Sequence, residues 1–331
     1  MKRENSEIIK DIPREILLDL YRVMLRIRLV ELKIEELYSQ DEMKTPVHLC
    51  VGQEAIAAGV CANLKKDDFC FSNHRCHGHY LAKGGDLKAM IAELYCKETG
   101  CSKGRGGSMH LVDTAAGFCG TSSIIAGSIP IATGAGLSAI LQKTGKVSVV
   151  FFGDAGVEQG VFYESVSFAV LKKLPVIYVC ENNLYSVCTP LKERQPDDKI
   201  YRRAEGFSIP SYEVDGNDVI EVYNVARGAV ESAKNGEGPS FIECKTYRTR
   251  DHAGAGSGIN LGYRTQEELD QWALKCPARN YENLLLESGL LNKDSVENIK
   301  SSIEREIKEA FEFAQKSPLP NVNDISKHLY E

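Results

Sequence analysis

The residues of this chain best suited to metal chemistry stand just after two apolar segments. Asp154 follows a β-branched and aromatic run at 146–153, and Asn183 lies two residues beyond a similar run at 175–181. Carboxylate and amide oxygens are ligands that Mg²⁺ prefers, and phosphate oxygens with a backbone carbonyl can complete its shell. Either residue alone could simply cap a helix or a turn. As a pair, each at the end of a strand-like run, they predict a magnesium site.

Glycines beside Asp154 indicate a phosphate as the partner of the metal. Gly153 and Gly156 let the backbone come close to phosphate oxygens. The helix expected from residue 161 would add free N–H groups at its start. The prediction is therefore a magnesium-bound phosphate group held by the loop after the first run.

A second phosphate motif competes with this interpretation. The segment 134–139 reads GxGxxA, and Asp154 lies 20 residues after its first glycine, as in dinucleotide-binding proteins. That fingerprint needs a strand immediately before the glycines, and Pro130 disfavours a buried strand there. We expect instead a helix of small residues at 129–141. An NAD-dependent dehydrogenase remains the less favoured alternative.

Histidines gather in the first third of the chain around a single arginine. Five of the seven histidines lie between positions 48 and 110: His48, His74, His77, His79 and His110. Arg75 can hold a phosphate through two parallel hydrogen bonds, and neutral imidazoles can bind a carboxylate or carbonyl. Zinc is the alternative, but the spacing matches none of the common structural zinc patterns. The segment 103–110, with its lysine, arginine and glycines, is either a basic loop beside the same pocket or a structural turn.

The elements that must position these residues alternate in type. Strand-like runs at 146–153, 175–181 and 240–248 are separated by helical stretches at 161–173 and 218–234. This order predicts an α/β fold with a parallel sheet flanked by helices, and ligands bind such sheets beyond the carboxyl ends of the strands. Helical periodicity marks both ends of the chain. We expect an N-terminal helical arm (1–45), an α/β domain (46–260) and a C-terminal helical segment (261–331).

Composition limits the class of protein. The chain has 331 residues, 43% hydrophobic and 26% charged, with a net charge of −6. This mild acidity gives no basic surface for nucleic acid, and no apolar run is long enough to span a membrane. The eleven cysteines form no CxxC pair, so we expect reduced thiols rather than disulfides or a metal site. A cytoplasmic protein without a secretory signal fits these features.

Five motifs together resemble a known family. Gly153-Asp154 followed by Asn182-Asn183 resembles the thiamine-diphosphate signature. In order along the chain stand HLCVGQEA (48–55), RCHG (75–78), KGRGGSMH (103–110), KLPVIYVCENN (173–183) and KTYRTRDH (245–252). This series is similar to alpha subunits of thiamine-diphosphate-dependent 2-oxo acid dehydrogenases, the first components of the pyruvate, branched-chain and acetoin complexes. The similarity extends over about residues 15 to 315.

The resemblance implies a role for each residue of the predicted site. Thiamine diphosphate and Mg²⁺ would be the cofactors. The metal ligands would be Asp154, Asn183 and the carbonyl of Tyr185. The diphosphate would contact Arg75, Gly153, Ala155, Gly156 and His252. The pyrimidine ring would contact Ser123, Ile125 and His74, the last in place of the family's usual aromatic residue. Catalytic histidines would be His48, His77 and His252, with His48 and His77 facing the substrate.

The activity implied by the resemblance is the oxidative decarboxylation of a 2-oxo acid, by default pyruvate, with transfer of the acyl group to a lipoyl group. Acetoin and branched-chain 2-oxo acids are the alternative substrates. The glutamate that activates the cofactor belongs, in this family, to a beta subunit. We therefore expect an α₂β₂ heterotetramer that works with a lipoyl-bearing acyltransferase and with no nucleic acid or membrane. A non-catalytic relative is the third hypothesis, although it would not need a complete metal-ligand set.

Overall fold

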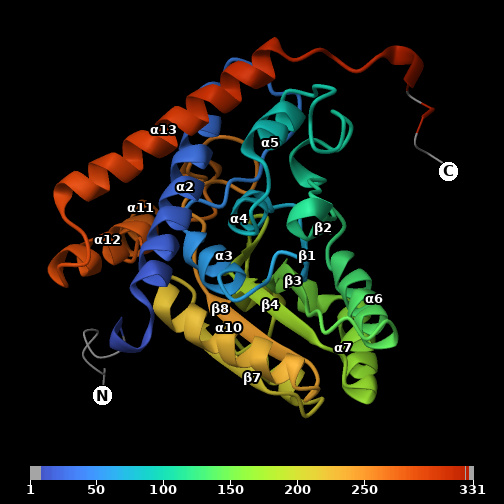
Figure 1. Cartoon of the computed structure of the whole chain (residues 1–331). Helices are drawn as coiled ribbons and strands as arrows, with labels where there is room; N and C mark the ends of the chain where they lie inside the picture. The colour runs from blue at the N-terminus through green and yellow to red at the C-terminus, as the bar shows by residue number, and fades with distance from the viewer. Residues whose placement is uncertain (1–8, 325, 328–331) are drawn as a thin grey trace.

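A six-stranded parallel sheet forms the centre of the computed structural model, which describes residues 9–324 and 326–327 (Figure 1). The strands follow the order β2-β1-β3-β4-β8-β7. Their bounds are β1 (Phe69–Ser72), β2 (Phe118–Thr121), β3 (Ser148–Gly153), β4 (Val176–Asn182), β7 (Ser211–Asp215) and β8 (Ser240–Lys245). A separate antiparallel pair consists of β5 (Tyr185–Ser186) and β6 (Thr189–Pro190). The expected α/β class with a parallel sheet is confirmed.

Helices cover both faces of the sheet. The longer ones are α2 (Arg14–Tyr38), α3 (Glu54–Cys61), α5 (Leu87–Leu94), α6 (Ser128–Leu141), α7 (Gly160–Lys172), α10 (Val219–Lys234), α11 (Gln266–Leu274), α12 (Pro277–Glu287) and α13 (Lys293–Lys316). The shorter ones are α4 (His77–Ala82), α8 (Leu191–Arg194) and α9 (Tyr201–Glu205). Along the described part of the chain, no helix combines the length and apolar character needed to cross a bilayer.

Alternate residues of the central strands explain this layering. Val149 and Phe151 of β3 are buried in a cluster with residues of α2, α3 and α10. Val150 and Phe152 point the other way, into a cluster with residues of α6 and α7. Figure 1 shows these two helical layers on opposite sides of the sheet. A strand buried on both faces must be apolar at nearly every position, which is the pattern seen in the sequence.

Helix α6 contains the GxGxxA segment in its middle. A Cβ atom at Gly136 would lie 2.5 Å from Cγ2 of Val176 on β4, so the missing side chain lets the helix approach the sheet. Pro130 lies in the first helical turn, where the lack of an N–H costs nothing. The expected helix is confirmed, and Gly136 serves packing against the sheet.

The two ends of the chain form an outer layer together. Helix α13 runs against α2 and α5, and α12 also packs on α2 (Figure 1). An ion pair joins Arg26 of α2 to Glu306 of α13 at 2.7 Å. Both terminal helices expected from periodicity are present, and they bury apolar faces as anticipated.

Candidate active site

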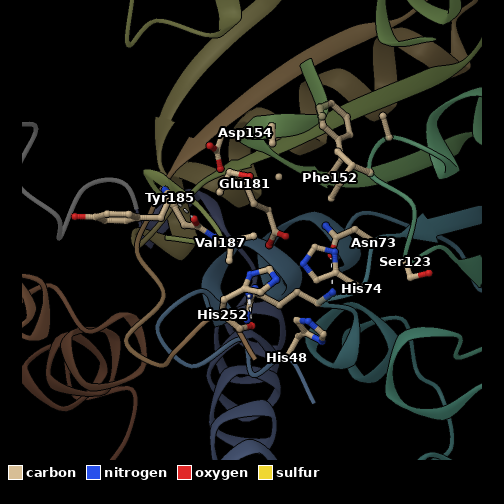
Figure 2. Close-up of a pocket in the computed structure, with 18 of the residues that line it drawn as sticks. His48, Asn73, His74, Ser123, Phe152, Asp154, Glu181, Tyr185, Val187 and His252 are labelled. Carbon is tan, nitrogen blue, oxygen red and sulfur yellow. Dashed lines mark hydrogen bonds between the residues drawn. The ribbon is translucent and has the colours of Figure 1, made fainter. Parts of the chain in front are cut away.

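A cavity of about 210 Å³ opens at the carboxyl edge of the sheet (Figure 2). The segments after β1, β2, β3, β4 and β8 contribute its walls, together with the loop before α3. Every residue to which the family resemblance gave a role lines this cavity except His77. Strand order explains the convergence, because β1, β3, β4 and β8 are consecutive neighbours whose parallel carboxyl ends meet at one edge.

The predicted metal ligands come from adjacent strand ends. Gly153 at the end of β3 pairs with Glu181 of β4, so Asp154 and Asn183 each begin the loop beyond a paired position. Both side chains are buried and border the cavity. The Oδ1 atom of Asn183 accepts a hydrogen bond from the backbone N–H of Tyr185 at 3.3 Å. The Asp154 carboxylate and the Asn183 side-chain amide therefore lie at the wall formed by the ends of β3 and β4.

The Asp154 carboxylate forms an ion pair with a positively charged side chain of the same chain. The Arg194 guanidinium, at the end of α8, donates to Asp154 and also to Glu158. Burial raises the pKa of Asp154, and the nearby Arg194 charge opposes that rise. A buried carboxylate that pairs with a guanidinium is placed to accept Mg²⁺ instead, once the arginine moves away. The donor set therefore fits a magnesium ion.

A short 3-10 turn, η4 (Asp154–Glu158), follows β3 and presents small residues to the cavity. A Cβ atom at Gly153 would meet no atom within 4 Å, whereas one at Gly156 would lie 2.8 Å from Cδ2 of Phe152. Gly156 thus lets the turn pack on Phe152, and Gly153 leaves room beside Asp154. This turn is a suitable cradle for a phosphate group.

Arg75 supplies a positive charge to the lining of the cavity. Its guanidinium is buried and donates to the carbonyls of Leu49, at 2.6 Å, and His252, at 3.1 Å. Burial, with the positive charge of Arg248, lowers the pKa of Arg75 to about 10, so the side chain stays charged in neutral solution. Arg75 therefore ties the loop of His252 to the cavity and offers a charge to an anion.

Three histidines from distant segments meet beside Arg75. His48, His74 and His252 have ring centroids 4.7 to 5.4 Å apart. Burial, followed by the charge of Arg75, lowers their pKa values to about 2, about 3 and about 4 respectively. The imidazoles are therefore neutral at physiological pH and can both donate and accept hydrogen bonds.

His77 differs from the expectation that it faces the substrate. It is fully buried, with Nδ1 2.7 Å from Glu31 Oε1 and Nε2 2.7 Å from Ser108 Oγ. Helix α4 begins at this residue and directs the ring toward α2, away from the cavity. Both nitrogens already have partners, and the ring does not border the cavity.

Two residues of the site were not identified from the sequence. The Glu181 carboxylate points into the cavity between His74 and His252 (Figure 2), and His79 Nε2 lies 3.1 Å from its Oε1. Its position at the end of β4, directly before Asn182, is the signal that could have revealed it. Arg194 lies on a short helix with no motif, and nothing in the sequence indicated its contact with Asp154.

The segment 103–110 is a structural turn, the second of its two interpretations. The buried Glu93 carboxylate accepts hydrogen bonds from the backbone N–H groups of Ser102, Gly104, Gly106 and Gly107 at 2.8 to 3.0 Å. Of this segment, Met109 alone borders the cavity. The turn therefore supports the wall rather than supplying charge to it.

The fold and cavity together define a class: an α/β protein that binds a magnesium-bound phosphate compound at the carboxyl edge of a parallel sheet. Residues 21–323 match the family described as "Dehydrogenase E1 component". This chain belongs to that family, and the resemblance drawn from the motifs is confirmed. Members of the family are oxidoreductases that use thiamine diphosphate with Mg²⁺.

Named relatives agree with this assignment. The alpha subunit of the acetoin:2,6-dichlorophenolindophenol oxidoreductase of Bacillus subtilis is 40% identical, with 94% of this chain and 92% of the relative covered. The pyruvate dehydrogenase E1 alpha subunit of Porphyra purpurea is 38% identical, with 95% and 92% covered. That of Rickettsia bellii is 34% identical, with 94% of each chain covered.

Proposed function

We propose that this chain is the alpha subunit of a first component that decarboxylates pyruvate oxidatively and passes the acyl group to a lipoyl group. The observation that carries the proposal is that Asp154 and Asn183, at the ends of adjacent strands, share one cavity with Arg75. A carboxylate and an amide beside a guanidinium suit a magnesium-bound diphosphate. When bound, thiamine diphosphate supplies a ring that accepts the electrons released as carbon dioxide leaves.

Each residue of the site is proposed to contact a particular part of the cofactor or the substrate. Asp154, Asn183 and the Tyr185 carbonyl would hold Mg²⁺, while Arg75 and the Gly153–Gly156 turn would hold the diphosphate. Contacts to the pyrimidine ring are assigned to Ser123, Ile125 and His74. His48 and His252 would donate hydrogen bonds to the substrate or move protons at its oxygen atoms. His77 has no place in this scheme, because its ring does not reach the cavity.

Acetoin is the second candidate substrate. The relative that oxidises acetoin is 40% identical to this chain, against 38% and 34% for the two pyruvate relatives described above. These identities are similar, so acetoin and pyruvate are both tested as substrates. Branched-chain 2-oxo acids complete the set.

The shape of the cavity supports the need for a beta subunit. Pockets that enclose a ligand of cofactor size have volumes of about 300–1,000 Å³, and this cavity has about 210 Å³. Ile125 in its lining is exposed, as are the neighbouring Ile124 and, near the start of the adjoining α6, Ile131. Exposed apolar residues beside a small pocket suit a second protein surface that completes it. The arrangement proposed is α₂β₂, with a lipoyl-bearing acyltransferase as the next partner.

We further assign the protein to the cytoplasm. All eleven cysteines of the described residues are free thiols, and several are buried in the core, as in proteins of reducing compartments. The division into a helical arm (1–45), a cofactor domain (46–260) and a C-terminal segment (261–331) remains our proposal for the roles of these parts.

The experiment that tests this function is co-expression of the chain with its beta subunit. We expect turnover of pyruvate, acetoin or a branched-chain 2-oxo acid that depends on thiamine diphosphate and Mg²⁺, with the favoured substrate showing the highest kcat/KM. The alpha chain alone should be inactive. Strong turnover by the alpha chain alone would contradict the shared site, and NAD binding without magnesium would favour the dehydrogenase alternative.

A further inference from the structure

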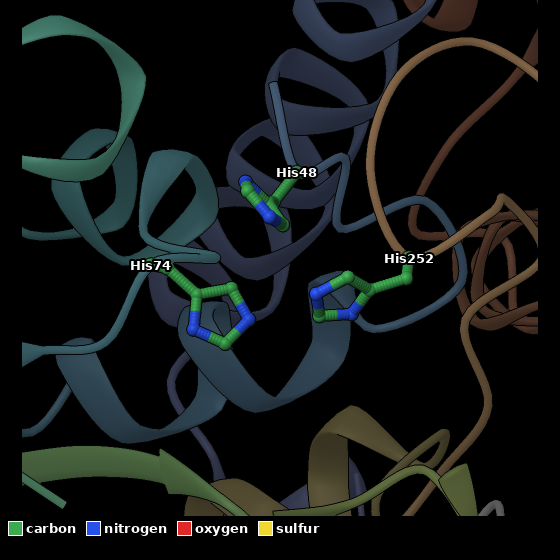
Figure 3. Close-up of side chains that lie close together, drawn as sticks. All are labelled: His48, His74 and His252. Atoms are coloured by element: carbon green, nitrogen blue, oxygen red, sulfur yellow. The ribbon is translucent and has the colours of Figure 1, made fainter. Parts of the chain in front are cut away.

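Three imidazoles converge on one point of the cavity wall (Figure 3). His48 lies in the loop before α3, His74 directly after β1, and His252 in the loop after β8. One ring nitrogen from each residue can be chosen so that all three nitrogens lie within 4.8 Å of one another. Two segments of the first third of the chain and one near residue 250 thus build a single group of ligand atoms.

None of these three rings has a hydrogen-bond partner among the side chains and backbone groups of the described residues. Nδ1 of His48 is buried without a partner, and the His48 side chain is almost entirely shielded from solvent. The neighbouring His77 and His79 behave in the opposite way, because each has both nitrogens engaged. A buried polar atom without a partner is unfavourable, so the cluster is suited to bind a ligand.

The imidazoles also have the protonation state that metal binding requires. Burial lowers the pKa of all three rings far below neutrality. Each ring is therefore neutral and keeps one nitrogen lone pair free, with no proton to displace.

We propose that His48, His74 and His252 bind a divalent transition metal ion such as Zn²⁺. Imidazole nitrogen suits Zn²⁺, Co²⁺, Ni²⁺ and Cu²⁺ rather than Mg²⁺. Three histidines with an open fourth position form a recognised type of zinc site. Ligand nitrogens in a tetrahedral site with Zn–N bonds of about 2.0–2.1 Å lie about 3.3 Å apart. The three ligand nitrogens therefore need to approach one another by at most about 1.5 Å.

This site is separate from the predicted magnesium ligands. Asp154 and Asn183 offer hard oxygen atoms at the strand ends. The three histidines offer nitrogen atoms, and Figure 2 shows them across the cavity from Asp154. The charges of Arg75 and Arg248 oppose a second cation, and the Glu181 carboxylate beside the histidines offsets part of that repulsion. An occupied cluster would withdraw His48 and His252 from catalysis, so the bound metal acts as an inhibitor.

The test uses the untagged full chain, freed of metal with a chelator, and Co²⁺ as the probe, because tetrahedral Co²⁺ absorbs strongly in the visible region. We expect one Co²⁺ per chain, displaced by Zn²⁺ but not by a large excess of Mg²⁺. His74→Phe keeps an aromatic ring and removes one ligand. It should weaken Co²⁺ binding at least about 100-fold, because even the partners of metal ligands are worth about 10–100-fold in affinity.

His110→Ala is the matched control, because it removes an exposed histidine that does not border the cavity. It should bind Co²⁺ as the wild type does. Absence of saturable binding to the wild type, full binding by His74→Phe, or loss of binding in His110→Ala would overturn the proposal.

A second measurement keeps the test decisive should His74→Phe fail to fold. X-ray absorption of the zinc-loaded wild-type chain should show three imidazole nitrogens at about 2.0 Å. A shell of oxygen atoms, or fewer than three imidazoles, refutes the site. The inference rests on the histidine cluster alone, so its failure would leave the proposed function standing.

Discussion

The contact between Arg194 and Asp154 makes a quantitative prediction about magnesium binding. Arg194 occupies the carboxylate that Mg²⁺ would use, and the two side chains retain only 11% and 3% of their accessible surface. The pair is therefore buried rather than a weak surface contact. Hydrogen bonds to charged groups contribute about 1.5–3 kcal/mol. Magnesium must displace this interaction, so the apparent affinity is reduced by the same free energy.

Arg194→Met removes the charge but keeps an apolar side chain of similar length. Because about 1.4 kcal/mol corresponds to a tenfold change in affinity, we expect Mg²⁺ to bind roughly 10- to 100-fold more tightly, while the metal-free protein becomes less stable. Isothermal titration of Mg²⁺ in the presence of thiamine diphosphate measures the first effect and urea unfolding the second. Arg202→Met is the control, since Arg202 pairs with Asp197 on the exposed surface. Unchanged or weaker magnesium binding by Arg194→Met would refute the competition.

Other predictions concern the packing and the histidines. Gly136→Ala should destabilise the protein by about 1–3 kcal/mol through overpacking on Val176. Gly134→Ala, with open space around it, should instead stabilise the protein by up to about 1 kcal/mol. Urea unfolding compares the two variants, and equal effects would argue against the packing role of Gly136. His74 has its pKa lowered from 6.5 to about 3 in the folded chain, so below pH 6.5 the unfolded chain binds a proton that the folded chain does not, and stability falls. His74→Phe should therefore gain up to about 2 kcal/mol relative to the wild type between pH 7.5 and pH 5, in unfolding measured with a chelator present; a pH-independent difference would count against a neutral buried ring. His48→Ala should reduce acyl transfer to a lipoyl group more than it reduces thiamine diphosphate affinity, and equal losses would speak against its role at the substrate.

The central strands could be predicted because each is buried on both faces. β3 and β4 contain continuous apolar runs, and β8 is apolar apart from the buried Glu243 and its terminal residues; a parallel sheet is the natural fold for such runs separated by helices. β1 and β2 were missed because each has only four residues. β7 was missed because it lies at the sheet edge with mostly exposed or half-exposed side chains.

Site residues that come directly after a strand in the sequence could be predicted. Contacts that form only through tertiary packing could not. Asp154 and Asn183 come directly from the rule that ligands bind beyond the carboxyl ends of parallel strands. The family resemblance placed His77 at the substrate, but helix α4 begins at this residue and its ring contacts Glu31. Arg194 reaches Asp154 from 40 residues away, a contact that no local spacing encodes.

The ion pair between Arg26 and Glu306 spans 280 positions of the chain. Ribosomes add about 5–20 residues per second, so α2 leaves the ribosome roughly 15–60 s before α13 can cover it. During that interval the face of α2 that later contacts α13 has no partner. Nascent chains should therefore depend on chaperones late in translation, and truncations near the C-terminus should aggregate through the same helix face.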